Sequence, residues 1–117
     1  LGGIDVAPFT VLHGTVPILG YRIGGLAYIT DGIELPDDSF NLLRGVDALV
    51  INALRRKPHP THFNLQGALE AIERVGPRRA FLTHISHDFD HAELERELPA
   101  GVQPAHDGLS FDVSHNV

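Results

Sequence analysis

The sequence contains no cysteine and no methionine among its 117 residues. Without cysteine there is no disulfide framework and no thiolate, so any metal ion would have to be bound by histidine, aspartate and glutamate side chains alone. A complete translated protein begins with methionine unless it has been processed, whereas this chain begins with leucine. We therefore expect the chain to be a fragment of a longer protein.

Long apolar runs and a surplus of positive charge are also missing. No segment approaches the roughly 18 apolar residues of a membrane span, and no secretory signal opens the chain, which predicts a soluble, cytoplasmic protein without membrane contact. The formal net charge is −6. A nucleic-acid partner is therefore not expected, because binding along a phosphate backbone needs a basic surface.

The patterning of the remaining residues predicts an α/β fold. Apolar and β-branched runs of strand length indicate strands at 4–14, 21–31, 47–54, 78–84 and 109–113. Helical spacing indicates helices at 64–76 and 90–99, with a further short helix possible at 39–45. Asn64 and Gly76 can cap the first of these helices, and Asp90 with Glu93 three residues later forms a capping box on the next.

Several of the histidines lie close to the ends of these strands. His13, Asp31, His62 and His84 each lie just beyond a predicted strand or in the loop that follows one. Open α/β sheets gather their ligand groups at such positions. A lone histidine at a strand end is more often a capping or surface residue, so spacing alone leaves both interpretations open. His59 lies between two prolines and is expected to face solvent.

The loop RRKPHPTH, residues 55–62, holds the main concentration of positive charge in this acidic chain. Arg55, Arg56 and Lys57 could receive a phosphate monoester or diester, although an ordinary solvated loop would have the same composition. His62 comes immediately before the predicted helix start, where partial positive charge favours an anion.

The order VLHG, AYITD, PTHF before a helix and FLTHISHD resembles the C-terminal half of metallo-β-lactamase-fold hydrolases. Within that superfamily it is most similar to the phosphonate-pathway (phosphoribosyl) cyclic phosphodiesterases, and the resemblance covers nearly the whole chain. It implies half of an αββα sandwich over residues 1–117, with a mixed sheet, helices on one face and a two-metal site at one edge. The HxHxDH signature of the N-terminal half is absent from the sequence.

The resemblance also implies roles for individual residues. His13 matches a histidine on the first metal, His84 one on the second, and Asp31 the carboxylate that bridges both ions. His62 matches a histidine that contacts the substrate phosphate or protonates the leaving oxygen. The expected catalytic residues are therefore Asp31 and His62. The expected substrate-binding residues are His62 and the three cations of the basic loop, Arg55, Arg56 and Lys57. His87 could orient a ligand or lie in an exposed loop.

The function implied is metal-dependent hydrolysis of phosphodiesters, with a small cyclic phosphate or nucleotide-like substrate. The expected cofactors are two divalent ions, zinc or manganese, which hold the attacking water between them. The alternatives are a tRNA-processing endonuclease or a thioester hydrolase of the same fold, or a non-catalytic structural or metal-binding fragment. The chain alone is expected to be inactive. It is also expected to form a homodimer or to associate with the missing N-terminal half, because half a sandwich exposes an apolar sheet face.

Overall fold

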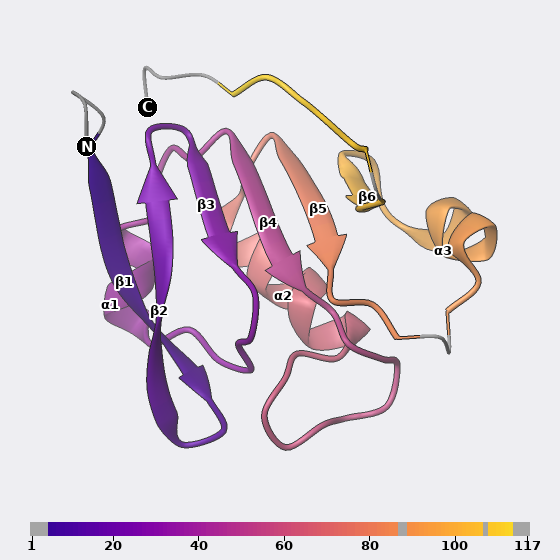
Figure 1. The fold of residues 1–117 in the computed structure, drawn as a ribbon, viewed down its shortest axis with the longest axis horizontal. Helices are drawn as coiled ribbons and strands as arrows, with labels where there is room; N and C mark the ends of the chain where they lie inside the picture. Colours follow the sequence, from indigo (N-terminus) through magenta and orange to yellow (C-terminus); the bar gives the residue numbers. More distant parts are fainter. Residues whose placement is uncertain (1–4, 87–88, 107, 114–117) are drawn as a thin grey trace.

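The computed structural model of the chain describes residues 5–86, 89–106 and 108–113. These residues form a six-stranded sheet in the order β1-β2-β3-β4-β5-β6, with three helices (Figure 1). The strands are β1 (Val6–His13), β2 (Val16–Ile23), β3 (Leu26–Ile29), β4 (Ala48–Asn52), β5 (Arg79–Thr83) and β6 (Val102–Pro104). The helices are α1 (Asp37–Asn41), α2 (Leu65–Val75) and α3 (His91–Glu97). The predicted α/β fold with a mixed sheet is confirmed.

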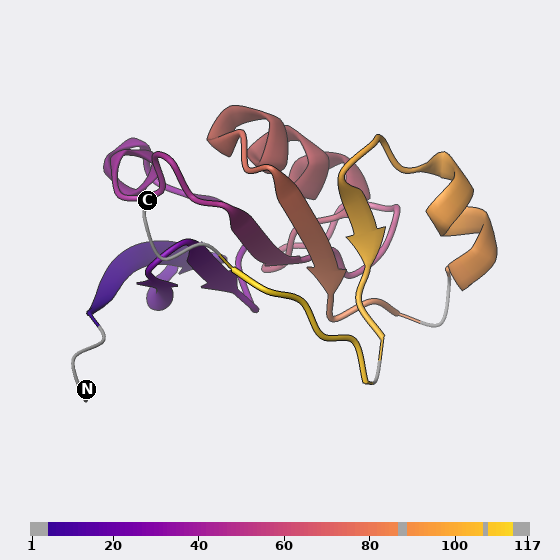
Figure 2. The ribbon, with the colours of Figure 1, turned by 90° about the horizontal axis from the view of Figure 1, so that it is seen from above.

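The direction of the strands determines where loops can meet. β1, β2 and β3 form an antiparallel meander, whereas β3, β4, β5 and β6 are parallel and are joined through α1, α2 and α3. The three crossovers all move across the sheet in the same direction. Because they also have the same handedness, they place the three helices on the same face of the sheet, as Figure 2 shows. β1, β3, β4 and β5 also point the same way, and their C-terminal ends therefore meet at one edge of the sheet (Figure 1).

The main core lies between the sheet and the helices. α2 covers the middle of the sheet and is capped as the sequence predicts: Asn64 accepts a hydrogen bond from the Gly67 N–H at 2.8 Å, and Gly76 ends the helix in the left-handed region. Fully burying one aliphatic side chain contributes about 1.5–3 kcal/mol. The strand and helix residues that share this core include Val11, Ile29, Leu49, Ile51, Ala68, Ile72, Leu82 and Leu94. Among the described residues, no helix is long and apolar enough to cross a membrane.

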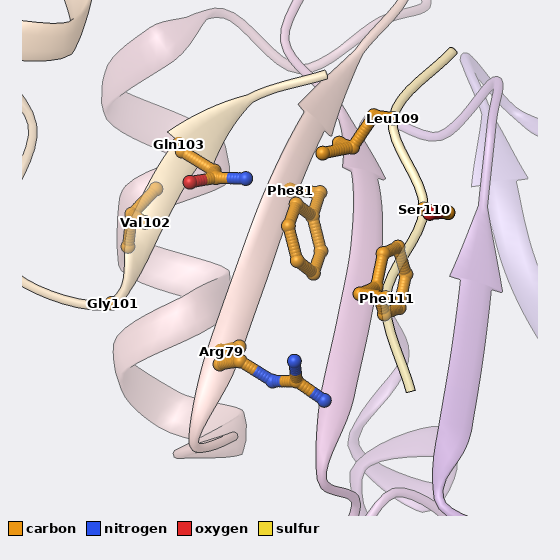
Figure 3. A pocket seen from close by; sticks show the side chains of 8 residues that line it. All are labelled: Arg79, Phe81, Gly101, Val102, Gln103, Leu109, Ser110 and Phe111. Atoms are coloured by element: carbon orange, nitrogen blue, oxygen red, sulfur yellow. The ribbon is translucent and has the colours of Figure 1, made fainter. Parts of the chain in front are cut away.

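The C-terminal segment, residues 108–113, lies on the opposite face of the sheet (Figure 2). Phe111 stacks on Phe81 of β5, with ring centroids 4.1 Å apart, and Leu109 packs beside it. Together with Arg79 these side chains line a pocket of about 380 Å³ (Figure 3). The strand predicted at 109–113 is wrong, because this segment buries alternate apolar side chains without joining the sheet. The last strand of the sheet is β6, which precedes this segment in the chain.

Beyond that segment, the same face is open over β2 and β3. Tyr21 pairs with Tyr28 in the strand register, and both point to the face that the helices do not cover. Leu19, two residues before Tyr21, shares their side of the sheet. The exposed fractions are 56% for Leu19, 42% for Tyr21 and 44% for Tyr28. These three side chains form an exposed apolar patch, which we call the open face.

Candidate functional site

The edge where β1, β3, β4 and β5 end brings together the residues that the sequence predicts as ligands. His13 is the last residue of β1, Asp31 follows β3 by two residues, and His84 directly follows β5. His62 reaches the same edge from the loop between β4 and α2. Its ring centroid lies 4.9 Å from that of His13 and 5.2 Å from that of His84, and its Nε2 lies 3.5 Å from Asp31 Oδ1. His62 is therefore the centre of the cluster.

The donor atoms of this cluster fit a divalent metal ion. Asp31, His62 and His84 each offer one ligand atom, and these atoms lie within 4.8 Å of one another. Imidazole nitrogen and carboxylate oxygen are ligands for zinc, and imidazole and carboxylate also suit manganese. Ligands about 2.1 Å from a tetrahedral ion stand roughly 3.4 Å apart, so small side-chain rotations would close the group around an ion. His13 touches His62 but is not part of this three-residue group.

The loop that carries Asp31 is fixed by the buried side chain of Asn52. Asn52 is the last residue of β4 and is fully buried. Its Nδ2 donates to the Gly32 carbonyl at 2.8 Å and its Oδ1 accepts from the Gly32 N–H at 3.0 Å. A side chain at position 32 would clash, since an added Cβ would lie 2.5 Å from Val11 Cγ1. This role of Asn52 was not predicted from the sequence, although a single amide at the end of an apolar strand was a signal for it.

His84 adopts a backbone conformation that is costly for a residue with a side chain. Its φ is +57°, and no other non-glycine residue in the described ranges has a positive φ. The left-handed conformation costs about 1–2 kcal/mol. Hydrogen bonds on both sides keep the chain there: Ala53 N–H donates to the Thr83 carbonyl at 3.0 Å, and Ser86 N–H to the Leu54 carbonyl at 2.9 Å. A conformation held in this way is common at functional sites.

The surroundings of His62 favour the neutral form of its ring. Its side chain is only 14% exposed. Desolvation lowers the pKa of His62, and the neighbouring His13, His59 and His84 lower this pKa further, while the hydrogen bond to Asp31 raises it. A neutral imidazole keeps one nitrogen lone pair, which can bind a metal ion or accept a proton.

His59 belongs to the same cluster, and the expectation that it faces solvent is wrong. It is half-buried, and its ring lies 5.0 Å from that of His62 in an edge contact. No local pattern in the sequence could show this contact, because it depends on how the whole loop folds back on itself.

Two of the three cations in the basic loop have partners that hold the loop in place. Arg55 donates to the carbonyls of Lys57 and Pro58, at 3.3 and 2.7 Å. Arg56 bonds both carboxylate oxygens of Glu97 in α3, at 2.8 and 2.7 Å. Within the part of the chain that the structure describes, the Lys57 ammonium makes no hydrogen bond or ion pair. The predicted role of His87 concerns a residue that lies outside this part.

The sequence matches, over residues 1–85, the model of a family described as the beta-lactamase superfamily domain. The chain therefore belongs to this superfamily. The six-stranded mixed sheet with helices on one face is half of the αββα metallo-β-lactamase sandwich, as the sequence predicts.

Two solved structures illustrate the likeness. A diphosphatase from the PhnP family is 49% identical, with a TM-score of 0.91 over 93% of this chain and 43% of that chain. The short form of human tRNase Z is 18% identical, with a TM-score of 0.72 over 95% of this chain and 44% of that chain, which shows the fold alone.

A curated relative, an octanoyltransferase of Porphyromonas gingivalis (strain ATCC BAA-308 / W83), is 37% identical over 111 residues. That match covers 91% of this chain and 22% of the relative. The present chain thus spans less than half the length of each of these three proteins.

Proposed function

We propose that this chain carries part of the active site of a metal-dependent hydrolase that cleaves a phosphodiester, in a small cyclic phosphate or a nucleotide-like substrate. The observation that carries the proposal is the convergence of His13, Asp31, His62 and His84 on one sheet edge. The 49% identity to a diphosphatase supports chemistry at phosphorus. A phosphate carries negative charge that the cationic loop beside the cluster can attract, whereas the acyl group of a thioester carries no such charge.

Asp31 and His84, with His13, are the residues that we propose as ligands of zinc or manganese. Two divalent ions, when bound, supply a nucleophile from water near neutral pH and neutralise charge on the phosphate. Asp31 is suited to reach two ions, because a carboxylate has two oxygens and its side chain is half exposed. The hydrogen bonds between Asn52 and Gly32 keep its backbone in place for this task.

His62 is suited to act on the substrate itself. Its ring faces Asp31 through Nε2. A phosphate that enters the site brings negative charge beside this ring, which favours the protonated imidazole. The same side chain can therefore bind the anion and then give its proton to the leaving oxygen. Lys57, whose ammonium makes no hydrogen bond or ion pair with the described residues, is the loop cation best placed to attract the anion from solution.

The proposal is tested on the whole protein as its gene encodes it. Purified protein is stripped of metal with a chelator, reloaded with zinc or with manganese, and assayed on bis(p-nitrophenyl) phosphate, a nucleoside 2′,3′-cyclic phosphate, a precursor tRNA and an acyl thioester. We expect metal-dependent turnover of the small phosphodiesters. Turnover of only the thioester or only the RNA would replace this proposal by one of the two alternative activities of the fold.

The open face is proposed to bind the rest of the sandwich, a segment outside the 117 residues. The relatives are more than twice as long as this chain, and an apolar patch of this kind usually marks a contact surface. The isolated chain should therefore dimerise or aggregate, and should neither bind two ions per chain nor hydrolyse bis(p-nitrophenyl) phosphate. Tyr28→Lys in the isolated chain should reduce that self-association, which light scattering measures. A monomeric unmodified chain would contradict the proposal.

A further inference from the structure

We propose that residues 109–113 form a strand of the second sheet of the sandwich, and that this strand pairs with one from the part of the whole protein outside these 117 residues. The partner strand lies over β3 and covers the open face. In this chain the segment is coil, and the strand predicted there is absent from its sheet. This inference rests on the proposed contact between the open face and the rest of the sandwich, but not on the proposed hydrolysis.

The side chains of the segment alternate as they do in a strand with one face in a core. Leu109, Phe111 and Val113 are half-buried and pack on a cluster formed by β4 and β5, whereas Ser110 and Asp112 are exposed. Figure 3 shows Leu109 and Phe111 turned towards β5 and Ser110 turned away. Strands of a sandwich carry apolar side chains on the inner face and polar ones on the outer face. The segment therefore has the pattern of a strand in the layer above this sheet.

Most main-chain groups of the segment have no partner among the described residues. The Leu109 N–H donates to the His106 carbonyl at 3.1 Å, and the Asp112 carbonyl accepts from the Arg79 guanidinium. No further hydrogen bond joins the main chain of 109–113 to the described part of the protein. Main-chain N–H and C=O groups that become buried almost always have a partner. A second layer that covers this face therefore has to supply partners for the segment.

The contact between Arg79 and Asp112 indicates the edge along which the partner lies. Neighbouring residues of an extended strand direct their main-chain groups to opposite edges. Arg79 belongs to β5, so the Asp112 carbonyl points to the β5 side of the segment. The main-chain groups of Phe111 and Val113 then point to the other side. The segment packs on β4, and the strand beyond β4 on that side is β3.

A strand paired along this edge lies over the open face. Neighbouring strands of one sheet are about 4.8 Å apart, so the partner runs above β3 and the next strand of its sheet above β2. Tyr28 of β3 and Tyr21 of β2 are 44% and 42% exposed there, and both become covered. The two solved relatives are more than twice as long as this chain, which is enough for a second sheet.

Amide hydrogen exchange in the whole protein, measured residue by residue by NMR, tests the pairing directly. The N–H groups of Phe111 and Val113 should exchange at least about 100-fold more slowly than those of Ser110 and Asp112, because only the first two donate to the partner strand. Burial beneath a helix or a loop would not produce this alternation. Equally fast exchange of Phe111 and Asp112 overturns the inference.

Nuclear Overhauser effects across the pair identify the partner strand. The Phe111 N–H should contact main-chain protons of a residue outside these 117, at every protein concentration used. Contacts with the same segment of a second copy, or slow exchange that is lost on dilution, assign the pairing to a dimer and overturn the inference.

Two proline substitutions form a matched pair. Each removes one N–H of the segment and favours an extended conformation in the residue before it. Val113→Pro removes a donor on the paired edge and should speed exchange of the Phe111 N–H by about 10–100-fold. Asp112→Pro removes an N–H on the β5 edge, keeps the carbonyl that Arg79 binds, and should leave that exchange within about threefold. Equal acceleration by the two substitutions overturns the inference.

These measurements are independent of catalysis. If the whole protein hydrolyses no phosphodiester, the proposed function fails, while slow exchange at Phe111 and Val113 alone still supports the pairing. If Tyr21 and Tyr28 are shielded from solvent in the whole protein but Phe111 and Asp112 exchange alike, the open face keeps its proposed cover and the strand pairing is overturned.

Discussion

Asn52 hydrogen-bonds through its side-chain amide to both backbone polar groups of Gly32, the residue that directly follows Asp31. A fully buried amide at the end of β4 thereby fixes the loop after β3, and with it the carboxylate proposed to bind metal. The Gly32 carbonyl also accepts from the Phe63 N–H at 2.7 Å, which ties the same point to the residue after His62. Asp31 and His62 are thus held to one another through backbone bonds beneath the site.

Asn52→Ala should therefore destabilise the protein and loosen the site together. The buried Gly32 N–H would lose its acceptor and a cavity would remain, at a cost of about 2–4 kcal/mol in the free energy of unfolding. Urea denaturation measures this loss, and metal titration should show weaker binding. Asn41→Ala, at an exposed asparagine in α1, is the control and should change stability by less than about 0.5 kcal/mol. Equal effects of the two substitutions would contradict this account of Asn52.

Replacing Asp31 by alanine should lower metal content and activity together, because a bridging carboxylate serves both ions. Elemental analysis of the purified whole protein checks the metal content, and turnover of bis(p-nitrophenyl) phosphate checks the activity. Asp38→Ala changes an exposed carboxylate of α1 and should affect neither. If Asp31→Ala retained two ions per chain, Asp31 would not be the bridge.

His84 allows its imidazole to be separated from its backbone conformation. His84→Gly removes the ring but relieves the left-handed strain, so it should be more stable than His84→Ala by about 1 kcal/mol. Both variants, together with His84→Asn, which tolerates this conformation, should lose one metal ion preferentially. Thermal unfolding and elemental analysis give the two results independently. Equal stability of the glycine and alanine variants would show that the positive φ is not maintained in solution.

The three cations of the basic loop should behave differently from one another. Lys57→Ala should raise KM for a phosphodiester more than it lowers kcat, because its ammonium, which has no partner among the described residues, only attracts the anion. Arg55→Ala should lower kcat as well, because Arg55 holds the loop that carries His59. Arg56→Ala should act mainly on stability, by releasing the loop from Glu97. Steady-state kinetics combined with urea denaturation distinguishes the three, and identical kinetic profiles would contradict these assignments.

The sequence predicted those parts of the fold that depend on local pattern. α2 and α3 were predicted with their N-caps Asn64 and Asp90, because capping residues next to helical spacing are local signals. The strand expected at 109–113 was wrong because alternate apolar residues can also cover a sheet as coil. β2 starts at Val16, earlier than expected, since Pro17 and Gly20 obscure its pattern.

The candidate site, like the fold, could be predicted only in part. Strand ends of parallel direction meet at one edge, so the convergence of His13, Asp31 and His84 could be anticipated from their positions after apolar runs. The sequence could not show that the ligand atoms of His62 would group with those of Asp31 and His84, while His13 lies outside this group. The contacts of His59 and Asn52 were also missed, because they join segments whose approach is decided by the packing of the whole domain.

The central claim, that the cluster around His62 hydrolyses phosphodiesters, is tested most directly by His62→Ala in the whole protein, with turnover and metal content measured on the same preparation. We predict that turnover of bis(p-nitrophenyl) phosphate falls by about 10²–10⁴-fold while both metal ions remain bound. Loss of an ion together with activity would make His62 a metal ligand instead of the residue that acts on the substrate. Turnover within a few-fold of the unmodified protein would contradict the claim and place the active site elsewhere.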